Sequence, residues 1–329
     1  MKKLSLLMIL CLCVCLGYAQ QVTLNDVARG TYRTEGIYGI KPMLDGEHYT
    51  QISRDGKKIV KYSFKTGKEV ATVFDVETAR NHTLRSFDDY IMSPDESKIL
   101  IQTETKPIYR RSFTAVYYIY NVRNNTLEPL SDGGPQQVPL FSPDGNQIAF
   151  VRDNNLFLVK LLFGNSESQV TKDGKFNEVL NGIPDWVYEE EFGFNRAFDF
   201  SADSQMLAYI RFDESQVPMY SFPWYKGMAP ALNEYEVYPG EYEYKYPMPS
   251  IDNSKVTVHT FDIKSRVTRQ MDLPLDVDGY IPRIKLTNDE NALAIMTLNR
   301  HQNRFDLYLA NPRSTLCKLI IRDEADQYI

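Results

Sequence analysis

Cysteine is scarce in this sequence, and its few cysteines are poorly placed for disulfide bonds. Cys11, Cys13 and Cys15 lie together near the amino terminus, which leaves Cys317 alone in the rest of the chain. A single cysteine cannot form an intrachain disulfide framework, so packing has to stabilise the folded part. Because Cys317 precedes the apolar run at residues 318–321, we expect it to be buried as a small hydrophobic side chain.

The sequence also lacks the common signatures of catalysis and of metal or nucleotide binding. None of its 17 glycines forms Gly-x-Ser-x-Gly, the nucleophile motif of α/β-hydrolases, and there is no glycine-rich phosphate loop. His48, His82, His259 and His301 stand apart from one another and from cysteine. We therefore expect surface histidines, no metal site and no cofactor, and no catalytic residue can be assigned.

Clustered positive charge is absent as well. The formal net charge is -6, the isoelectric point is near 5.4, and lysine and arginine are scattered. A nucleic-acid partner is not expected, because such a surface needs a basic field. The apolar content of 43% and aromatic content of 12% are typical of a folded globular protein, with room for one large all-β domain or two ordinary ones.

The first residues predict export. Lys2 and Lys3 precede an apolar run, and Gly17-Tyr18-Ala19 supplies small residues for cleavage. We predict a signal peptide at residues 1–19 and a periplasmic, cell-surface or secreted location for the mature chain.

Two alternatives to a cleaved signal stay open. A membrane anchor would need roughly 20 apolar residues, and the run from Leu4 to Ala19 has 16. Lipid modification of Cys15 is the other alternative, although Leu12-Cys13-Val14 lacks the small residues that such processing prefers.

What the sequence does contain is a recurring turn phrase, each time followed by a short apolar strand. Its copies are Ser53-Arg54-Asp55-Gly56, Ser93-Pro94-Asp95-Glu96, Ser142-Pro143-Asp144-Gly145, Ser201-Ala202-Asp203-Ser204 and Thr287-Asn288-Asp289-Glu290. Proline presets the first turn dihedral, aspartate bonds back to the backbone, and glycine tolerates a positive φ. The phrase therefore predicts a hairpin turn at each position.

The spacing of the phrase predicts the fold class. Its copies follow one another after 40, 49, 59 and 86 residues, and the shortest step has the size of a four-stranded propeller blade. A β-sandwich would lack this long period, and a Rossmann-type fold would need long amphipathic helices that are missing. We predict an all-β β-propeller of four-stranded blades at residues 20–329, with about five blades represented. A short helix is expected at Leu24–Arg29, with Asn25 as its cap.

The segment at residues 218–249 is rich in proline and tyrosine. Its prolines are Pro218, Pro223, Pro230, Pro239, Pro247 and Pro249, and its aromatic residues include Tyr220, Trp224, Tyr225, Tyr235, Tyr238, Tyr242, Tyr244 and Tyr246. Prolines at this density disfavour central strands, whereas tyrosine buries a large area and keeps a polar tip. The segment is either an arm that packs on a partner or a loop folded over its own blade.

The run Asp185-Trp186-Val187-Tyr188-Glu189-Glu190-Glu191 is the most unusual local feature. Adjacent like charges repel, so the cluster favours capture of a cation over a merely solvated turn. Asp185 is placed to cap a helical turn that begins at Trp186. Because neighbouring helical residues diverge by about 100°, we expect two glutamates to point inward and one outward.

Several segments together resemble a known family. They are the run Asp185–Glu191, Phe200-Ser201-Ala202-Asp203, Val217-Pro218 with Tyr220-Ser221-Phe222, Tyr109-Arg110-Arg111-Ser112-Phe113-Thr114-Ala115, and Tyr280-Ile281-Pro282-Arg283-Ile284. In these segments the sequence resembles the propeller domain of dipeptidyl peptidase IV, in the prolyl oligopeptidase class of serine peptidases. The resemblance covers nearly all of the mature chain.

The resemblance implies roles for named residues. Glu190 and Glu191 would hold the free α-amine of a peptide substrate, and Glu189 would be structural. Arg110, with Arg111 as the less favoured register, would bind a carbonyl of the amino-terminal dipeptide. Cleavage would then remove X-Pro or X-Ala, and Pro223 to Pro249 would be an arm used in homodimer contacts.

The sequence departs from the family at its end. The family continues into an α/β-hydrolase domain with the catalytic Ser, Asp and His, and this sequence stops at Ile329. By resemblance the propeller has eight blades, so we expect an incomplete, poorly stable ring that is inactive alone. The alternative is a non-catalytic exported β-propeller that binds a protein or peptide. A sugar- or metal-dependent propeller enzyme has less support.

Overall fold

The computed structural model describes residues 22–34, 36, 38–162, 164–225 and 238–329. The chain divides into two compact units, Met1–Ile40 and Lys41–Ile329. The signal peptide predicted at residues 1–19 lies outside the described residues, as does the stretch 226–237 within the proline- and tyrosine-rich segment. Within the described ranges, no helix is both long and apolar enough to cross a membrane.

The first unit contains helix α2 (Leu24–Arg29), where a helix was expected. Its cap is Thr23, so the prediction of Asn25 was wrong. The Thr23 hydroxyl accepts a hydrogen bond from the amide of Asp26 at 3.1 Å, and the Asp26 carboxylate accepts one from the amide of Thr23 at 3.0 Å. This reciprocal pair satisfies two amides that the first helical turn leaves free, and Asn25 has no part in it.

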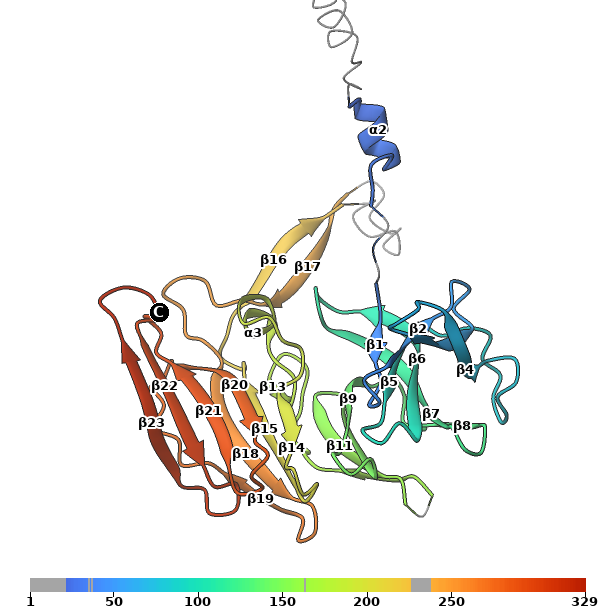
Figure 1. Ribbon diagram of the computed structural model, residues 1–329. Coiled ribbons are helices and arrows are strands. Elements are labelled where there is room, and N and C mark those ends of the chain that lie inside the picture. Colours follow the sequence, from blue (N-terminus) through green and yellow to red (C-terminus); the bar gives the residue numbers. More distant parts are fainter. Residues whose placement is uncertain (1–21, 35, 37, 163, 226–237) are drawn as a thin grey trace, which may run out of the picture. The chain divides into compact units, whose positions relative to one another are not determined.

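The second unit is built from consecutive antiparallel sheets, shown in Figure 1. Sheet 1 contains β1 (Lys41–Pro42), β2 (His48–Ile52), β3 (Lys58–Ser63) and β4 (Glu69–Asp75). Sheet 2 contains β5 (Asp89–Met92), β6 (Lys98–Pro107), β7 (Phe113–Asn121) and β8 (Thr126–Pro129). Sheet 3 contains β9 (Gln137–Phe141), β10 (Gln147–Arg152), β11 (Asn155–Lys160) and β12 (Ser166–Gln169).

Two further sheets and a separate hairpin follow. Sheet 4 contains β13 (Val179–Asn181), β14 (Phe198–Phe200), β15 (Met206–Asp213), β18 (Lys255–Asp262) and β19 (Val267–Gln270). Sheet 5 contains β20 (Tyr280–Leu286), β21 (Leu293–Leu298), β22 (Arg304–Ala310) and β23 (Cys317–Glu324). The hairpin pairs β16 (Met219–Trp224) with β17 (Gly240–Lys245) and lies within the predicted arm. The all-β class and the four-stranded repeat are confirmed, whereas the described strands form no closed sheet.

The hydrophobic core lies between successive sheets. Each of its four clusters combines residues of two neighbours: sheets 1 and 2, 2 and 3, 3 and 4, and 4 and 5. Alternation along a strand produces this arrangement, because successive side chains point to opposite faces. In β15, Leu207 packs toward sheet 3, whereas Ala208 and Phe212 pack toward sheet 5.

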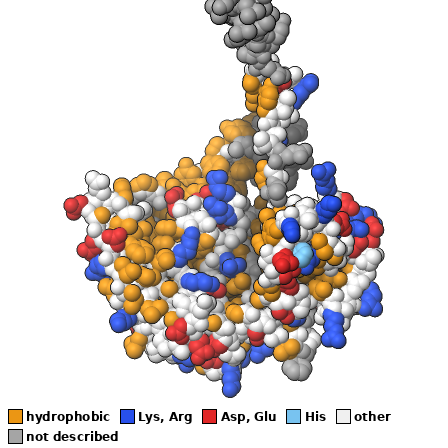
Figure 2. All heavy atoms as spheres, in the orientation of Figure 1, with side chains coloured by type: hydrophobic (Ala, Val, Ile, Leu, Met, Phe, Trp, Pro, Cys, Tyr) orange, Lys and Arg blue, Asp and Glu red, His pale blue; other side chains and the backbone are white. Residues whose placement is uncertain are grey.

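Sheet 5 exposes apolar side chains at the end of the described chain. In β23, Leu319, Ile320 and Ile321 are 40%, 48% and 51% exposed, and Figure 2 shows hydrophobic side chains gathered over this sheet. Cys317 on the same strand is half-buried rather than fully buried, and burial raises the pKa of its thiol to about 11. Among the described residues, sheet 5 therefore packs against a neighbouring sheet only through its contacts with sheet 4.

The recurring phrase forms turns through its serine. In four copies the hydroxyl accepts a hydrogen bond from the amide five residues later at 2.9 Å; the serines are Ser53, Ser93, Ser142 and Ser201. Thr287 differs, since its hydroxyl accepts from Asp289 at 3.1 Å. The side chain thus closes the turn and starts the following strand.

The position of the phrase differs in sheet 1. In sheets 2 to 5 it joins the first strand to a strand paired with it, but in sheet 1 it joins β2 to β3. The first turn of sheet 1 is instead formed at Asp45-Gly46, where Asp45 accepts a hydrogen bond from the amide of Glu47 at 3.0 Å. The 40-residue step from Ser53 to Ser93 therefore underestimates the repeat.

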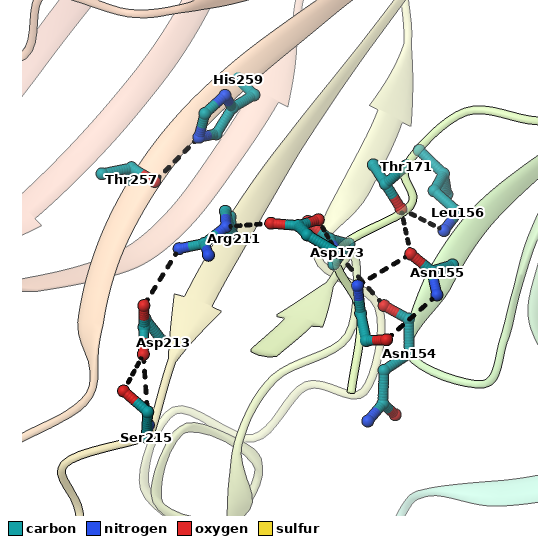
Figure 3. A network of polar contacts seen from close by, with 12 residues as sticks. Asn154, Asn155, Leu156, Thr171, Asp173, Arg211, Asp213, Ser215, Thr257 and His259 are labelled. Carbon is teal, nitrogen blue, oxygen red and sulfur yellow. Dashed lines mark hydrogen bonds and ion pairs between the residues drawn. The ribbon is translucent and has the colours of Figure 1, made fainter. Parts of the chain in front are cut away.

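A polar network joins sheet 3 to sheet 4 (Figure 3). The Arg211 guanidinium donates to the Asp173 carboxylate at 2.8 Å, and Asp173 also accepts from the side chain of Asn181 at 3.0 Å. His259 bonds to the Thr257 hydroxyl at 2.9 Å. His259 is partly buried, and this burial lowers the pKa of its imidazole to about 4.

The serine turns give a stability prediction. Ser142 is fully buried, and Ser142→Ala leaves the buried amide of Gln147 without its side-chain acceptor. We expect a loss of about 1–3 kcal/mol in the free energy of unfolding, measured by denaturant titration. Exposed Ser314 is the control, since Ser314→Ala should change stability by less than about 0.5 kcal/mol. Equal effects of the two substitutions would contradict the role of the hydroxyl.

Candidate functional site

The acidic run lies on helix α3 (Trp186–Glu191), which interrupts the first strand of sheet 4. Segment β13 pairs with residues 211–213 of β15, and β14 pairs with residues 207–209 of the same strand. The chain leaves the sheet between these two segments and forms the helix there. Because both ends of the insertion are held by one strand, the helix has a defined position relative to sheet 4.

Asp185 caps the helix, as predicted. Its carboxylate accepts hydrogen bonds from the Tyr188 amide at 2.9 Å and from the Ser254 hydroxyl at 2.5 Å. Asp185 is 7% exposed, and burial raises the pKa of its carboxyl above the ordinary range. The cap thus also fastens the start of the helix to the segment that leads into β18.

Two aromatic side chains fix the helix on other sides. The Tyr188 hydroxyl accepts a hydrogen bond from the amide of Ile281 in sheet 5 at 3.1 Å. The ring of Trp186 lies 5.0 Å from that of Tyr244 and 5.2 Å from that of Tyr246, measured between centroids. The helix therefore contacts both sheet 5 and the aromatic side of the β16–β17 hairpin.

The three glutamates have different surroundings. Glu189 is 1% exposed, and its carboxylate accepts hydrogen bonds from the amides of Arg111 and Ser112 at 2.6 and 2.8 Å. Glu190 forms an ion pair with Arg110, at 2.7 Å from its Nε. Glu191 is exposed. Helix geometry thus gives the three carboxylates different surroundings. That of Glu189 is buried and hydrogen-bonded to the backbone, that of Glu190 is paired with arginine, and that of Glu191 is exposed to solvent.

Arg110 and Arg111 lie at the tip of the β6–β7 hairpin of sheet 2. The side chain of Asn195 donates to the carbonyl of Arg111 at 2.9 Å, which adds a third bond to the two made by Glu189. Arg110 and Glu190, each named as a substrate-binding residue from the sequence, are therefore brought together across 80 residues of sequence. Arg111 contributes its backbone amide and carbonyl to the same junction.

A cavity of about 680 Å³ adjoins this junction. The residues from helix α3 and its flanks that line it are Asp185, Trp186 and Glu189, joined by Tyr109, Glu214 and Lys245. Within the described ranges, no group of three or more His, Cys, Asp or Glu side chains is arranged to hold a metal ion.

Glu214 is a feature that sequence reasoning missed. It is 5% exposed, and burial, reinforced by the charge of Asp185, raises the pKa of its carboxyl from 4.5 to about 7. In the sequence it ends an ordinary strand in Phe212-Asp213-Glu214-Ser215, with no motif around it. Only the fold shows that this carboxyl group lies inside.

Comparison with protein families gives one match that covers most of the chain. Residues 93–329 match the family model described as "Dipeptidyl peptidase IV (DPP IV) N-terminal region". The matched range includes both the β6–β7 hairpin and helix α3.

Individual relatives agree with this match. The chain is 33% identical to dipeptidyl peptidase 4 of Trichophyton equinum, over 90% of the chain and 37% of that protein. It is 32% identical to a probable dipeptidyl-aminopeptidase B of Tuber melanosporum, over 92% of the chain and 35% of that protein. The crystal structure of Porphyromonas gingivalis dipeptidyl peptidase 4 superposes with a TM-score of 0.86 and 43% identity, over 94% of this chain and 43% of that one. The chain thus spans well under half the length of these relatives.

The junction at Glu189 gives a second prediction. Glu189→Ala leaves two backbone amides of the hairpin tip without their acceptor, so we expect a loss of about 1–3 kcal/mol in the free energy of unfolding. Glu189→Gln keeps a carbonyl acceptor and should cost less. Denaturant titration of both variants checks this order. An equal loss of unfolding free energy in the two variants would show that Glu189 does not stabilise the fold through its hydrogen bonds to the two backbone amides.

Glu214 gives a prediction for pH. The pKa of Glu214 is about 7 in the folded chain and 4.5 when unperturbed. Between pH 4.5 and pH 7 the folded chain therefore binds a proton at Glu214 that the unfolded chain has released. The group therefore lowers the free energy of unfolding as pH rises from 4.5 to 7, by up to about 3 kcal/mol. Glu214→Gln cannot ionise, so its advantage over the wild type should grow from near zero at pH 4 to this value at pH 8.

The matched control for Glu214→Gln is Glu243→Gln, at an exposed position of the hairpin. Its stability should follow the wild type at every pH. Denaturant titrations across the pH series measure both variants. A difference between Glu214→Gln and wild type that stays constant with pH would contradict the raised pKa.

Proposed function

The chain belongs to the dipeptidyl peptidase IV family, and on this basis we propose that it recognises the free amino terminus of peptide substrates. In this proposal it is the propeller part of an exported serine peptidase that removes amino-terminal X-Pro or X-Ala dipeptides. The five sheets are successive blades of a ring that these blades alone do not complete.

The observation that carries the proposal is the arrangement of Glu190, Glu191 and Arg110. The side chain of Glu190 is 17% exposed and that of Arg110 is 71% exposed, and Glu191 is exposed beside them. A primary ammonium has three donors and one compact charge, which two neighbouring carboxylates satisfy better than one. Arg110 keeps further donors for a peptide carbonyl while its Nε pairs with Glu190.

This arrangement would fix the distance between the amino terminus of the peptide and the bond that is cleaved. Glu190 and Glu191 hold the amino terminus, and Arg110 orients the first residues, so the bond presented for cleavage is a fixed two residues away. Cleavage itself requires an activated nucleophile. We assign that chemistry to the α/β-hydrolase domain with which the family continues, and we expect this chain alone to be inactive.

The remaining parts of the proposal concern location and assembly. Residues 1–19 are proposed to direct export, with a periplasmic, cell-surface or secreted destination. The arm from Pro223 to Pro249 is proposed to contact a second copy of the protein. The described part of the arm supports this with exposed aromatic residues, since Tyr225 and Tyr238 are 54% and 80% exposed.

The amine clamp is tested by comparing two peptides that differ only at the α-amine. Gly-Pro amide should bind the chain more tightly than acetyl-Gly-Pro amide, as measured by calorimetric titration. Glu190→Gln removes one charged acceptor worth about 1.5–3 kcal/mol, so affinity for the free-amine peptide should fall at least about tenfold. Glu243→Gln is the control and should bind like the wild type. Equal affinity for the free and acetylated peptides would refute the clamp.

A further inference from the structure

Sheet 5 contacts helix α3 through the segment Tyr280–Arg283, at the start of β20. This strand is at an edge of its sheet, and its pairing with β21 shifts register between Tyr280 and Arg283, as at a β-bulge. Bulges often re-aim groups beside functional sites. Pro282 lies at the shift and has no amide to donate to a partner strand. The segment is therefore suited to direct its other groups out of the sheet.

The first residues of this segment hold the middle of the helix. The amide of Ile281 donates to the Tyr188 hydroxyl at 3.1 Å. The ring of Tyr280 lies 6.0 Å from that of Tyr188 and 5.6 Å from that of Phe192, measured between centroids. Because Tyr188 is 1% exposed, this part of the contact belongs to the hydrophobic core.

Arg283 contacts the carboxyl-terminal end of the helix. Its Nη2 donates to the carbonyl of Phe192 at 2.5 Å, and its Nη1 donates to the carbonyl of Pro282 at 2.7 Å. The guanidinium carbon lies 4.8 Å from the centroid of the Phe194 ring. Phe192 is the residue that ends α3. The planar guanidinium thus joins the end of the helix to the backbone of β20.

The end of α3 is a place where a cation is favourable for two reasons. The last carbonyls of a helix have no partner within it, and a basic side chain commonly supplies one. Glu190 and Glu191 are the last two residues of α3, where negative charge is unfavourable beside those carbonyls, and the last turn contains no basic residue. Arg283 supplies both a donor and a positive charge from another sheet.

We propose that Arg283 is a positioning residue of the amine clamp. By fixing the end of α3 to sheet 5, it sets the direction in which Glu190 and Glu191 present their carboxylates. The clamp itself rests on the proposed function. Arg283 acts through the helix, since its guanidinium bonds to backbone carbonyls, whereas the arginine assigned to the peptide is Arg110.

Amide hydrogen exchange tests the fixing of the helix end without any ligand. The amide of Phe192 donates to the carbonyl of Tyr188 at 3.1 Å, so a loosened helix end exposes it to exchange. Arg283→Met keeps an apolar stem and removes the donor, and residues 186–194 should then exchange at least about threefold faster than in the wild type. Arg283→Lys keeps a cationic donor and should restore most of the protection. Arg123→Met, at an exposed position between β7 and β8, is the matched control and should exchange like the wild type.

Calorimetric titration of the same variants tests the effect on the clamp. Arg283→Met should lower the affinity for Gly-Pro amide by about three- to thirtyfold and leave the weaker affinity for acetyl-Gly-Pro amide unchanged. Arg283→Lys should recover most of this loss. Exchange in the buried strands β10 and β11 should stay the same in every variant, which separates a change at α3 from a general loss of stability.

Three results would overturn the positioning role. They are unchanged exchange of residues 186–194 in Arg283→Met, no difference between Arg283→Lys and Arg283→Met, and faster exchange in Arg283→Met with an undiminished preference for the free amine. Equal affinity of the wild type for the free and acetylated peptides would refute the proposed function. The exchange comparison would still decide whether Arg283 fixes the helix, because it needs no ligand.

Discussion

The site depends on one buried carboxylate. Glu189 connects a helix inserted in sheet 4 to the tip of a hairpin from sheet 2, through two backbone amides. The hairpin fixes the direction in which its backbone amides point. The two hydrogen bonds therefore set both the distance of the hairpin tip from helix α3 and its orientation. The pairing of Arg110 with Glu190 follows from that position, because both residues are the sequence neighbours of the bonded groups. A buried residue thus determines the geometry of the residues proposed to bind substrate.

Much of the fold could be predicted from local chemistry. The serine and aspartate of the turn phrase act within a few residues of each other, which is why their hairpins were recognisable in the sequence. The cap at Asp185 and the helix that follows it are equally local. The cap of α2 was wrongly placed, because Thr23 and Asn25 are both good capping residues and the reciprocal bond with Asp26 decides between them. The position of the first turn in sheet 1 could not be recognised, since Asp45-Gly46 lacks the serine or threonine that begins the turn phrase in the other sheets.

The parts of the site that could not be predicted depend on contacts between distant segments. Glu190 and Arg110 were named from a family resemblance, and no spacing rule could have joined residues so far apart. Glu214 directly follows β15 and His259 lies on β18, and the local sequence leaves the orientation of both side chains open until neighbouring sheets are placed. For both residues, burial by other sheets and not the local sequence changes the chemistry of the side chain. A polar residue at the end or edge of a strand is therefore where sequence reasoning has least information.

The interrupted first strand of sheet 4 has a consequence for evolution. Segments β13 and β14 each pair with β15 over three residues, so the sheet is anchored on both sides of the insertion. Residues can be gained, lost or exchanged between these anchors without shifting the register of any strand. The strands of sheet 4 and the sequence of helix α3 can therefore diverge at different rates, and the side chains presented at this position can change while the surrounding architecture is inherited unchanged.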